Sequence, residues 1–166
     1  MLHQAVCAFR IISCDGDQQI ETFVGSKSQT MSTLCFSTYI QTNKHKTVLY
    51  TGVTNDLATR LIEHWIGKEG CFTTRYRVHF LIWSESTRYV LNAIAREKEI
   101  KKTSRYTKEL LINQSNPEWE FWNKAIVGNW PPTIEQMEVV KARWRKEDAE
   151  NIHDPLSFRM QVKSWG

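Results

Sequence analysis

The chain has 166 residues, of which 41% are hydrophobic and 24% are charged, and its formal net charge is +4. This length fits one ordinary domain, and this composition is typical of a globular protein rather than a disordered one. The longest apolar run, residues 78–83, is interrupted by a histidine and is too short to cross a bilayer. Because the start of the chain also lacks the pattern of a secretory signal, we expect an intracellular, cytoplasmic protein.

Charge and cysteine content narrow the function classes further. Residues 36–123 carry 13 Lys or Arg against 9 Asp or Glu, so the basic excess lies in the middle of the chain. Such an excess fits a polyanionic partner but does not establish one. The cysteines at positions 7, 14, 35 and 71 form no closely spaced pair. We therefore expect reduced thiols rather than a disulfide framework or a zinc site.

Residues 1–33 have no sustained hydrophobic period, and we expect them to form a poorly ordered or loosely packed N-terminal extension. One hypothesis is that the natural start is Met31, with residues 1–30 upstream of it. From residue 34 the pattern changes, because residues 34–41 and 48–53 are rich in the aromatic and β-branched residues of strands. If residues 43–46 form a four-residue hairpin loop, Tyr39 lies opposite Tyr50. Taken alone, this tyrosine pair fits packing as well as it fits a functional site.

A helix is predicted from a cap at Thr54 or Asn55 to about residue 67, with Arg60 and His64 on one face because they are four residues apart. Residues 78–83 then predict a buried third strand. A second long helix is predicted from a cap at Ser86 or Thr87 to about residue 103.

Within that second helix, Glu97 shares the inward face with Ile94 and Ile100, so its carboxylate must be paired, hydrogen-bonded or bound to a cation. The basic residues of this region are predicted to form a ridge on the solvent side: Arg96, Lys98, Lys101, Lys102, Arg105 and Lys108. A short helix over residues 108–113, a tryptophan-rich segment that caps a core or forms a contact surface, and a mixed-charge helix over residues 133–150 complete the pattern.

The order of these elements and the residues they carry resemble the GIY-YIG endonuclease superfamily, and in particular its small single-domain members, related to the N-terminal nuclease domain of UvrC. The matching motifs, in chain order, are Ser37-Thr38-Tyr39, Tyr50-Thr51-Gly52, Arg60, His64, GCFTTRY, Glu97 within AIAREKEIKK, and Asn116 within NPEW. Two positions depart from the family pattern, because Ser37 replaces a glycine and Thr51 replaces an isoleucine. Neither departure removes a catalytic side chain.

The resemblance implies an α/β (α+β) fold with a mainly antiparallel three-stranded sheet flanked by helices, in the order strand, strand, helix, strand, helix, helix. It covers residues 34–123, which follow the N-terminal extension and precede a helical extension over residues 124–166. It also implies a metal-dependent endonuclease that hydrolyses DNA, double-stranded or branched, with no small-molecule cofactor.

The resemblance further implies the site residues. The catalytic set is Tyr39, Tyr50, Arg60, His64 and Glu97, with Glu97 as the ligand of Mg²⁺, for which Mn²⁺ can substitute. The substrate-binding set is Gly52, Lys98, Lys101, Lys102, Arg105 and Asn116. A carboxylate is the hard ligand that Mg²⁺ prefers, and a guanidinium suits a phosphate. The general base stays open among the two tyrosines and His64.

Two other function classes stay open from the sequence. One is a nucleic-acid-binding module that keeps the fold without turnover, although a binding role alone does not require an inward carboxylate. The other is an interaction protein that uses its tryptophan-rich C-terminal part.

Overall fold

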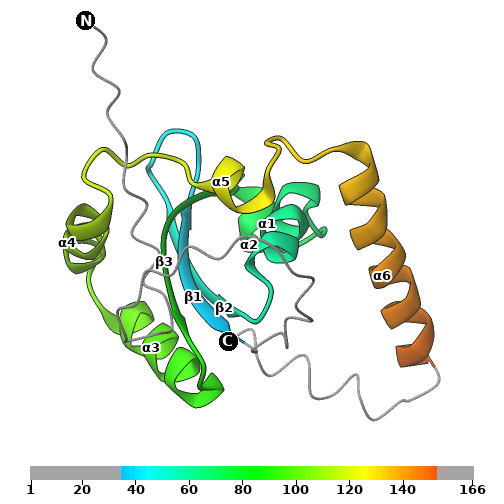
Figure 1. Cartoon of the computed structure of the whole chain (residues 1–166), viewed down its shortest axis with the longest axis horizontal. Coiled ribbons are helices and arrows are strands. Elements are labelled where there is room, and N and C mark those ends of the chain that lie inside the picture. Colours follow the sequence, from blue (N-terminus) through cyan, green and yellow to red (C-terminus); the bar gives the residue numbers. More distant parts are fainter. Residues whose placement is uncertain (1–34, 153–166) are drawn as a thin grey trace, which may run out of the picture.

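The computed structural model describes residues 35–152, with side chains as far as residue 149 (Figure 1). The predicted N-terminal extension over residues 1–33 and the alternative start at Met31 lie outside the described residues. Within the described part of the chain, no helix is both long enough and apolar enough to span a membrane.

The strands and the longer helices follow one another in the predicted order, and two further short helices are present. In chain order they are β1 (Phe36–Thr42), β2 (Leu49–Thr54), α1 (Leu57–Ile66), α2 (Phe72–Arg75), β3 (Phe80–Thr87), α3 (Val90–Lys102), α4 (Arg105–Ser115), α5 (Asn123–Val127) and α6 (Ile134–Ile152). The strands form one sheet in the order β2-β1-β3, and β1 pairs with both neighbours in antiparallel fashion. The predicted antiparallel three-stranded sheet flanked by helices, with a helical C-terminal region, is confirmed.

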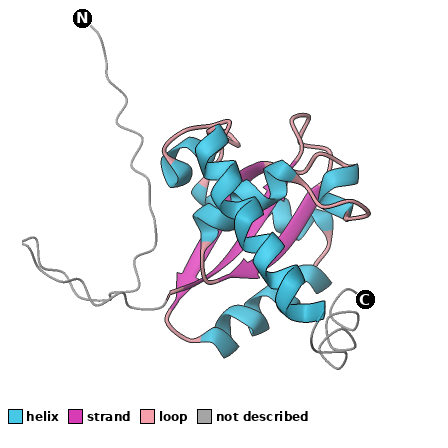
Figure 2. Ribbon diagram, turned by 90° about the vertical axis from the view of Figure 1, so that its right-hand side faces the viewer, coloured by secondary structure: helices cyan, strands magenta, loops and turns pink. Residues whose placement is uncertain are grey.

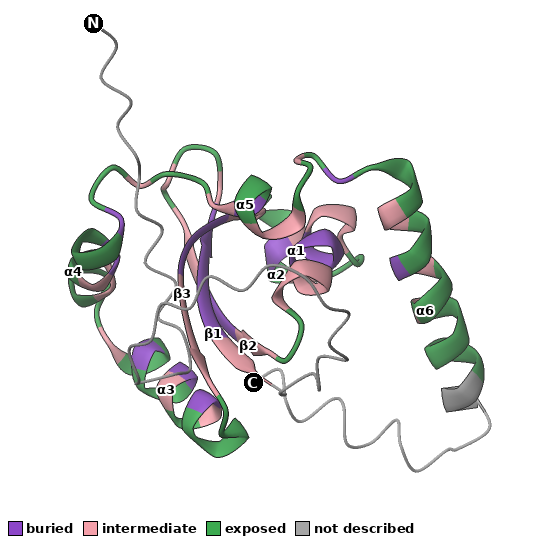
Figure 3. Cartoon of the chain, viewed as in Figure 1, coloured by how far each residue is buried: buried purple, intermediate pink, exposed green. Residues whose placement is uncertain are grey.

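Helices cover both faces of this sheet, as Figures 1 and 2 show. Successive residues of β1 point to opposite faces, so each face has its own core. On one face, Ile40 packs with Ile100 of α3 and Ile112 of α4. On the other face, Tyr39 packs with Leu61 of α1 and with side chains of α5. Figure 3 shows that the most buried positions follow the strands and the inward sides of these helices.

The register of the β1–β2 hairpin differs from the prediction by two residues. Tyr39 pairs with Gly52 rather than with Tyr50. The connection therefore contains residues 43–48 instead of residues 43–46. Because side chains alternate with a period of two, an even shift leaves Tyr39 and Tyr50 on the same face of the sheet, where they are diagonal neighbours.

Asn43 accounts for the longer connection. Its Oδ1 accepts a hydrogen bond from the Thr47 backbone N–H at 2.9 Å, and its Nδ2 donates to Thr47 Oγ1 at 2.7 Å. The Lys46 N–H also donates to the Asn43 carbonyl at 3.0 Å, and Lys46 has a positive φ of 58°. These bonds hold Thr47 in the turn, so it does not pair with Thr42.

The predicted start of α1 is close but not at the predicted caps. The N-cap is Asp56, whose Oδ1 accepts from the Thr59 N–H at 3.0 Å. Thr54 ends β2 instead, and its Oγ1 accepts from the Asp56 N–H at 3.1 Å. The short helix α2 follows between α1 and β3, where the sequence predicts no helix.

The predicted start of α3 is wrong, because β3 continues through both proposed caps. Ser86 pairs with Ser37 and Thr87 pairs with Phe36, and the two serine hydroxyls are hydrogen-bonded at 3.0 Å. The helix begins only at Val90, which is 42% exposed.

The C-terminal half of the chain closes the core. Helix α4 is longer than the predicted 108–113 and begins after Ser104, whose Oγ accepts from the Thr107 N–H. Trp119 packs against the core on the α3 and α4 side, and Trp122 and Trp130 pack against the core on the α1 side. The prediction that these tryptophans cap a core is confirmed, and α6 lies beyond them along α1 (Figure 1).

Candidate active site

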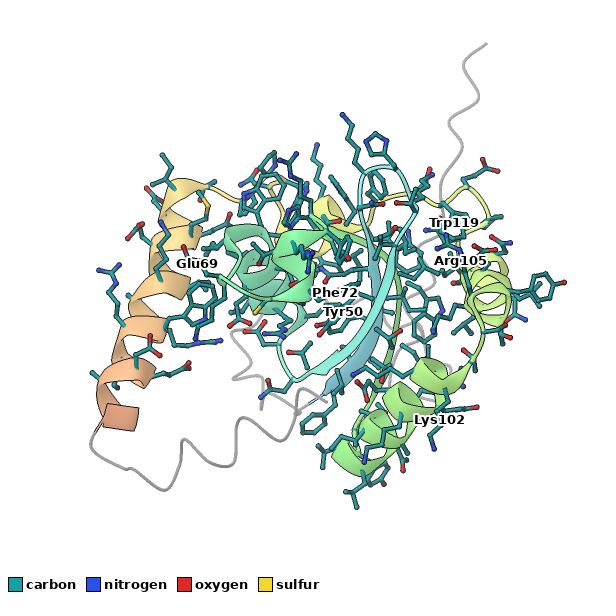
Figure 4. The ribbon with its side chains drawn as sticks, turned by 180° about the vertical axis from the view of Figure 1, so that it is seen from behind. Tyr50, Glu69, Phe72, Lys102, Arg105 and Trp119 are labelled. Atoms are coloured by element: carbon teal, nitrogen blue, oxygen red, sulfur yellow. The ribbon has the colours of Figure 1, made fainter. Side chains whose placement is uncertain are left out.

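Two tyrosines define the centre of the site. Tyr39 lies on the central strand β1 and is fully buried, whereas Tyr50 lies on β2 and is half-buried. Their ring centroids are 6.4 Å apart. Figure 4 shows Tyr50 beside Phe72 of α2, and the rings of these two residues stack with centroids 6.4 Å apart. The hairpin thus places one tyrosine in the interior and the other at its margin.

Gly52 makes room for the inner tyrosine. It pairs with Tyr39 across the sheet, and a Cβ atom at position 52 would lie 2.5 Å from the Tyr39 hydroxyl oxygen. No side chain fits at that distance unless the tyrosine moves. Gly52 is itself buried beneath the Tyr39 ring, so its geometry favours a structural role over the predicted contact with substrate.

Helix α1 brings Arg60 and His64 onto the Tyr39 hydroxyl, as their four-residue spacing predicts. The hydroxyl oxygen lies 2.9 Å from His64 Nε2, and Arg60 Nε donates to the same oxygen at 3.3 Å. A guanidinium can only donate, so the tyrosine oxygen accepts from Arg60 and its own proton is free to point at His64. This arrangement requires His64 Nε2 to act as an acceptor, with the imidazole proton on Nδ1.

Burial sets the charge of these two hydrogen-bonded groups. The pKa of His64 is lowered from 6.5 to about 3, first by burial and then by the positive charges of Arg60 and His79. Burial also raises the pKa of Tyr39 well above its usual value, although the Arg60 charge acts in the opposite direction. At neutral pH the cluster therefore contains a neutral imidazole, a neutral phenol and the guanidinium charge.

Glu63 is part of the site, and the sequence analysis does not identify it. Its side chain is buried, with 9% exposed, and its Oε2 accepts from Arg60 NH1 at 2.8 Å. Arg60 is thereby held between Tyr39 and Glu63. A signal was present in the sequence, because Glu63 lies three residues after Arg60 and next to the apolar stripe of the helix, as Glu97 does in its own helix.

Glu97 lies on α3 with its side chain turned inward, as predicted, and is 9% exposed. Its Oε1 is paired with Lys101 Nζ at 2.5 Å. Helix α3 contacts β1 at Thr38, whose Oγ1 donates to the Ala93 carbonyl at 3.0 Å. Within the described residues, no hydrogen bond or ion pair joins Glu97 to the Tyr39 cluster, so the structure brings four of the five predicted catalytic residues together and leaves Glu97 apart from them.

The side chains that could serve as metal ligands limit the kind of metal site that the described residues can form. Between residues 35 and 149, no group of three or more histidine, cysteine or acidic side chains is arranged to hold a metal ion. Glu97 offers one carboxylate, of which one oxygen is already bonded to Lys101. This donor set fits a weakly held, largely hydrated Mg²⁺ rather than a closed protein cage.

Only part of the predicted basic ridge is free to meet an anion. Lys98 and Lys102 are exposed, and neither forms an ion pair within the described residues. Lys101 instead neutralises Glu97, and Arg105 pairs with Glu109 at 2.7 Å. Arg105 also donates to two carbonyls of the β1–β2 connection, at 2.6 and 3.0 Å. Figure 4 labels Lys102 and Arg105, which lie on α3 and α4.

Asn116 was predicted to bind substrate, and the structure gives it a different role. It is 4% exposed, and its Nδ2 donates to the carbonyls of Ile82 and Glu120, both at 2.9 Å. Its Oδ1 accepts from the Glu120 N–H at 2.8 Å. Because every polar atom of the side-chain amide is bonded inside the protein, Asn116 ties the end of α4 to β3 and has no atom left for a substrate.

Comparison with known protein families gives a match that includes this site. The model of the GIY-YIG catalytic domain family matches residues 35–109, a segment that begins just before β1 and ends within α4. It includes all five predicted catalytic residues. No curated protein and no solved structure matched the chain. The family consists of endonucleases, so the matched segment is a nuclease domain whose substrates are nucleic acids. Residues 35–109 of the chain thus match a GIY-YIG catalytic domain, and this match supports membership of the GIY-YIG endonuclease superfamily.

Proposed function

We propose that the protein is a metal-dependent endonuclease that hydrolyses DNA phosphodiester bonds at the Tyr39–Arg60–His64 cluster, with Mg²⁺ held by Glu97. The observation that carries the proposal is the buried hydrogen-bond network of this cluster within a domain of an endonuclease superfamily.

Arg60 is suited to bind the scissile phosphate. Its Nε donates to Tyr39 and its NH1 donates to Glu63, whereas its NH2 has no hydrogen-bond partner among the described residues. The side chain is 30% exposed. A fixed guanidinium with a free edge can donate to the phosphoryl oxygens and stabilise the negative charge that grows there in the transition state.

The candidates for the proton acceptor differ in their environment. Tyr39 is fully buried and its pKa is raised, so it is a poor base without further activation. His64 is neutral at neutral pH and its Nε2 accepts from Tyr39, so it orients the hydroxyl, but its lowered pKa makes it a weak base as well. Tyr50 is half-buried and lies beside His64, with ring centroids 5.4 Å apart, where it can position the attacking water.

Glu97 is the residue that would hold Mg²⁺. When bound, the ion supplies positive charge that stabilises the phosphoryl and leaving oxygens. Glu97 offers a single, mostly buried carboxylate, so it would bind the ion weakly and the bound nucleic acid would complete the ligand set. Lys98 and Lys102, on the same helix, are free to contact neighbouring phosphates without reading sequence.

The test is nicking of supercoiled plasmid and cleavage of branched DNA with Mg²⁺ or Mn²⁺. Wild-type protein should cut only when metal is present, and Glu97→Ala should abolish cutting while DNA binding is retained. Glu99→Ala is the matched control, since Glu99 lies on the same helix but is exposed and, among residues 35–149, pairs with Arg96 alone. Unchanged cutting by Glu97→Ala refutes the metal role of Glu97.

A second outcome distinguishes the alternative function. If folded wild-type protein binds DNA but never cuts it with either metal, the protein is a nucleic-acid-binding module of the same fold. The Glu97–Lys101 ion pair is the observation that favours this alternative, because it already neutralises the proposed metal ligand.

A further inference from the structure

Glu63 lies between two guanidinium groups from distant parts of the chain. Its Oε2 accepts from Arg60 NH1 at 2.8 Å, and its Oε1 is bonded to NH2 of Arg143, a residue of α6 that is 80 positions further along the chain. The network thus runs from His64 through the Tyr39 hydroxyl, Arg60 and Glu63 to Arg143. Its last member lies outside residues 35–109, the segment that matches the family.

Helix α6 is held in place for this contact. Val140 is 3% exposed and faces the rest of the protein, and Arg143 follows it by three residues on the same side of the helix. One residue further, the Trp144 ring lies under Lys68 Nζ at 6.0 Å. Near the start of α6, Gln136 Nε2 donates to the Val127 carbonyl at 3.4 Å. Figure 1 shows α6 running alongside α1 and away from the sheet.

The Arg143 guanidinium changes the way in which Glu63 pairs with Arg60. A carboxylate facing a single arginine tends to engage it with both oxygens, in a bidentate pair. Here Arg143 holds one oxygen, so only one oxygen faces Arg60. Arg60 therefore keeps its Nε on the Tyr39 hydroxyl and its NH2 free.

We propose that Glu63 and Arg143 are positioning residues, which hold the Arg60 guanidinium on Tyr39 with one edge turned to the substrate. Helix α6 then contributes a residue that positions Arg60 in the site, although α6 lies outside the segment that matches the nuclease family. The catalytic consequence rests on the proposed function, whereas the positioning itself does not.

The kinetic test compares Arg143→Ala with Arg145→Ala. Arg145 lies on the same helix and pairs with Glu138, its one ion pair among the described residues, so its removal should leave cleavage unchanged. Arg143→Ala should lower kcat by roughly tenfold to a hundredfold, the range expected when a catalytic group is misplaced by about 1 Å. KM should change little, and Arg143→Lys should restore part of the loss because it keeps the charge.

A double-variant experiment separates positioning from a general loss of structure. Once Arg60 is replaced by alanine, Arg143→Ala should have no further effect on kcat, since its only route to the reaction has been removed. Equal losses in the wild-type and Arg60→Ala backgrounds overturn the proposal. If Arg143→Ala proves poorly folded, Arg143→Met, which keeps the aliphatic stem, takes its place.

A measurement without DNA keeps the proposal independent of the nuclease activity. The Arg60 Nε–H gives a signal in a ¹H–¹⁵N spectrum, which can be assigned by its loss in Arg60→Lys. We expect this signal to be protected from exchange in the wild type and in Arg145→Ala, and to broaden or disappear in Arg143→Ala. An unchanged signal in Arg143→Ala refutes the positioning role. A protein that cuts no DNA but shows the expected spectra refutes only the proposed function.

Discussion

At the scale of single residues, burial decides which protonation states the cluster can use. His64 accepts a hydrogen bond from Tyr39 through Nε2, and this is possible only while the imidazole is neutral. A protonated His64 would place a second positive charge next to Arg60 in a buried site, which explains the strongly lowered pKa. The neutral imidazole is therefore a consequence of the fold, and its Nε2 serves as a hydrogen-bond acceptor at neutral pH.

This lowered pKa predicts how stability depends on pH. The pKa of His64 is about 3 in the folded protein and near 6.5 when unfolded, so the unfolded chain binds the proton first as pH falls. The free energy of unfolding should decrease below pH 6.5, with a slope from this residue of up to about 1.4 kcal/mol per pH unit. Urea denaturation from pH 7.5 to pH 4.5 measures the slope.

His64→Gln should flatten this dependence, and His45→Gln should preserve it, because His45 is exposed in the β1–β2 connection. Some slope should persist in His64→Gln, since burial also lowers the pKa of His79. If His64→Gln and the wild type lose stability in parallel over this range, His64 is not held neutral in the folded protein.

At the scale of helices and strands, the sequence predicts the features that depend on local residue patterns. It does not predict the features that depend on contacts between residues far apart in the chain. The hairpin strands, α1 and the inward face of Glu97 follow from residue type and spacing. The hairpin register does not, because the Asn43 side chain closes a longer turn than the composition suggests. Ser86 resembles a helix cap but pairs with Ser37 of the central strand, and this pairing extends β3.

The residues of the candidate site also include some that the sequence predicts and some that depend on contacts between distant residues. Tyr39, Arg60 and His64 can be predicted, because a motif and a four-residue helical spacing bring them together. Glu63 shows only a weak signal, and Arg143 shows none, since its contact with Glu63 depends on how α6 packs against α1. Contacts between residues so far apart in sequence follow from tertiary packing and not from periodicity.

The start of β3 depends on one such tertiary contact, which allows a test. Asn123 of α5 is 1% exposed, its Oδ1 accepts from the Leu81 N–H and its Nδ2 donates to the His79 carbonyl, both at 2.8 Å. Asn123→Ala leaves both backbone groups without partners and should lower the free energy of unfolding by about 1–3 kcal/mol. Denaturant titration measures the change. Asn129→Ala, at an exposed position just after α5, should cost less than about 0.5 kcal/mol, and equal effects would mean that water replaces Asn123.

At the scale of the whole molecule, ion pairing determines where the net charge of +4 can act. Arg96, Lys101 and Arg105 each face an acidic partner on or beside their own helix. Lys98 and Lys102 are exposed, make no ion pair within the described residues, and share one face of α3 because they are four residues apart. We therefore expect this face of α3, the helix that carries Glu97, to contact nucleic acid.

Salt dependence of DNA binding tests this assignment. Each lysine that contacts a phosphate releases a counterion, so Lys98→Ala combined with Lys102→Ala should reduce the slope of log K against log salt by roughly one per lysine. The matched control is Lys141→Ala with Arg145→Ala, which removes the same charge from α6, where both residues pair with Glu138. Fluorescence anisotropy at several salt concentrations measures both slopes. If the two double variants reduce the slope equally, net charge rather than the α3 face governs binding; a loss confined to the α3 variant places the DNA backbone along the helix that holds Glu97.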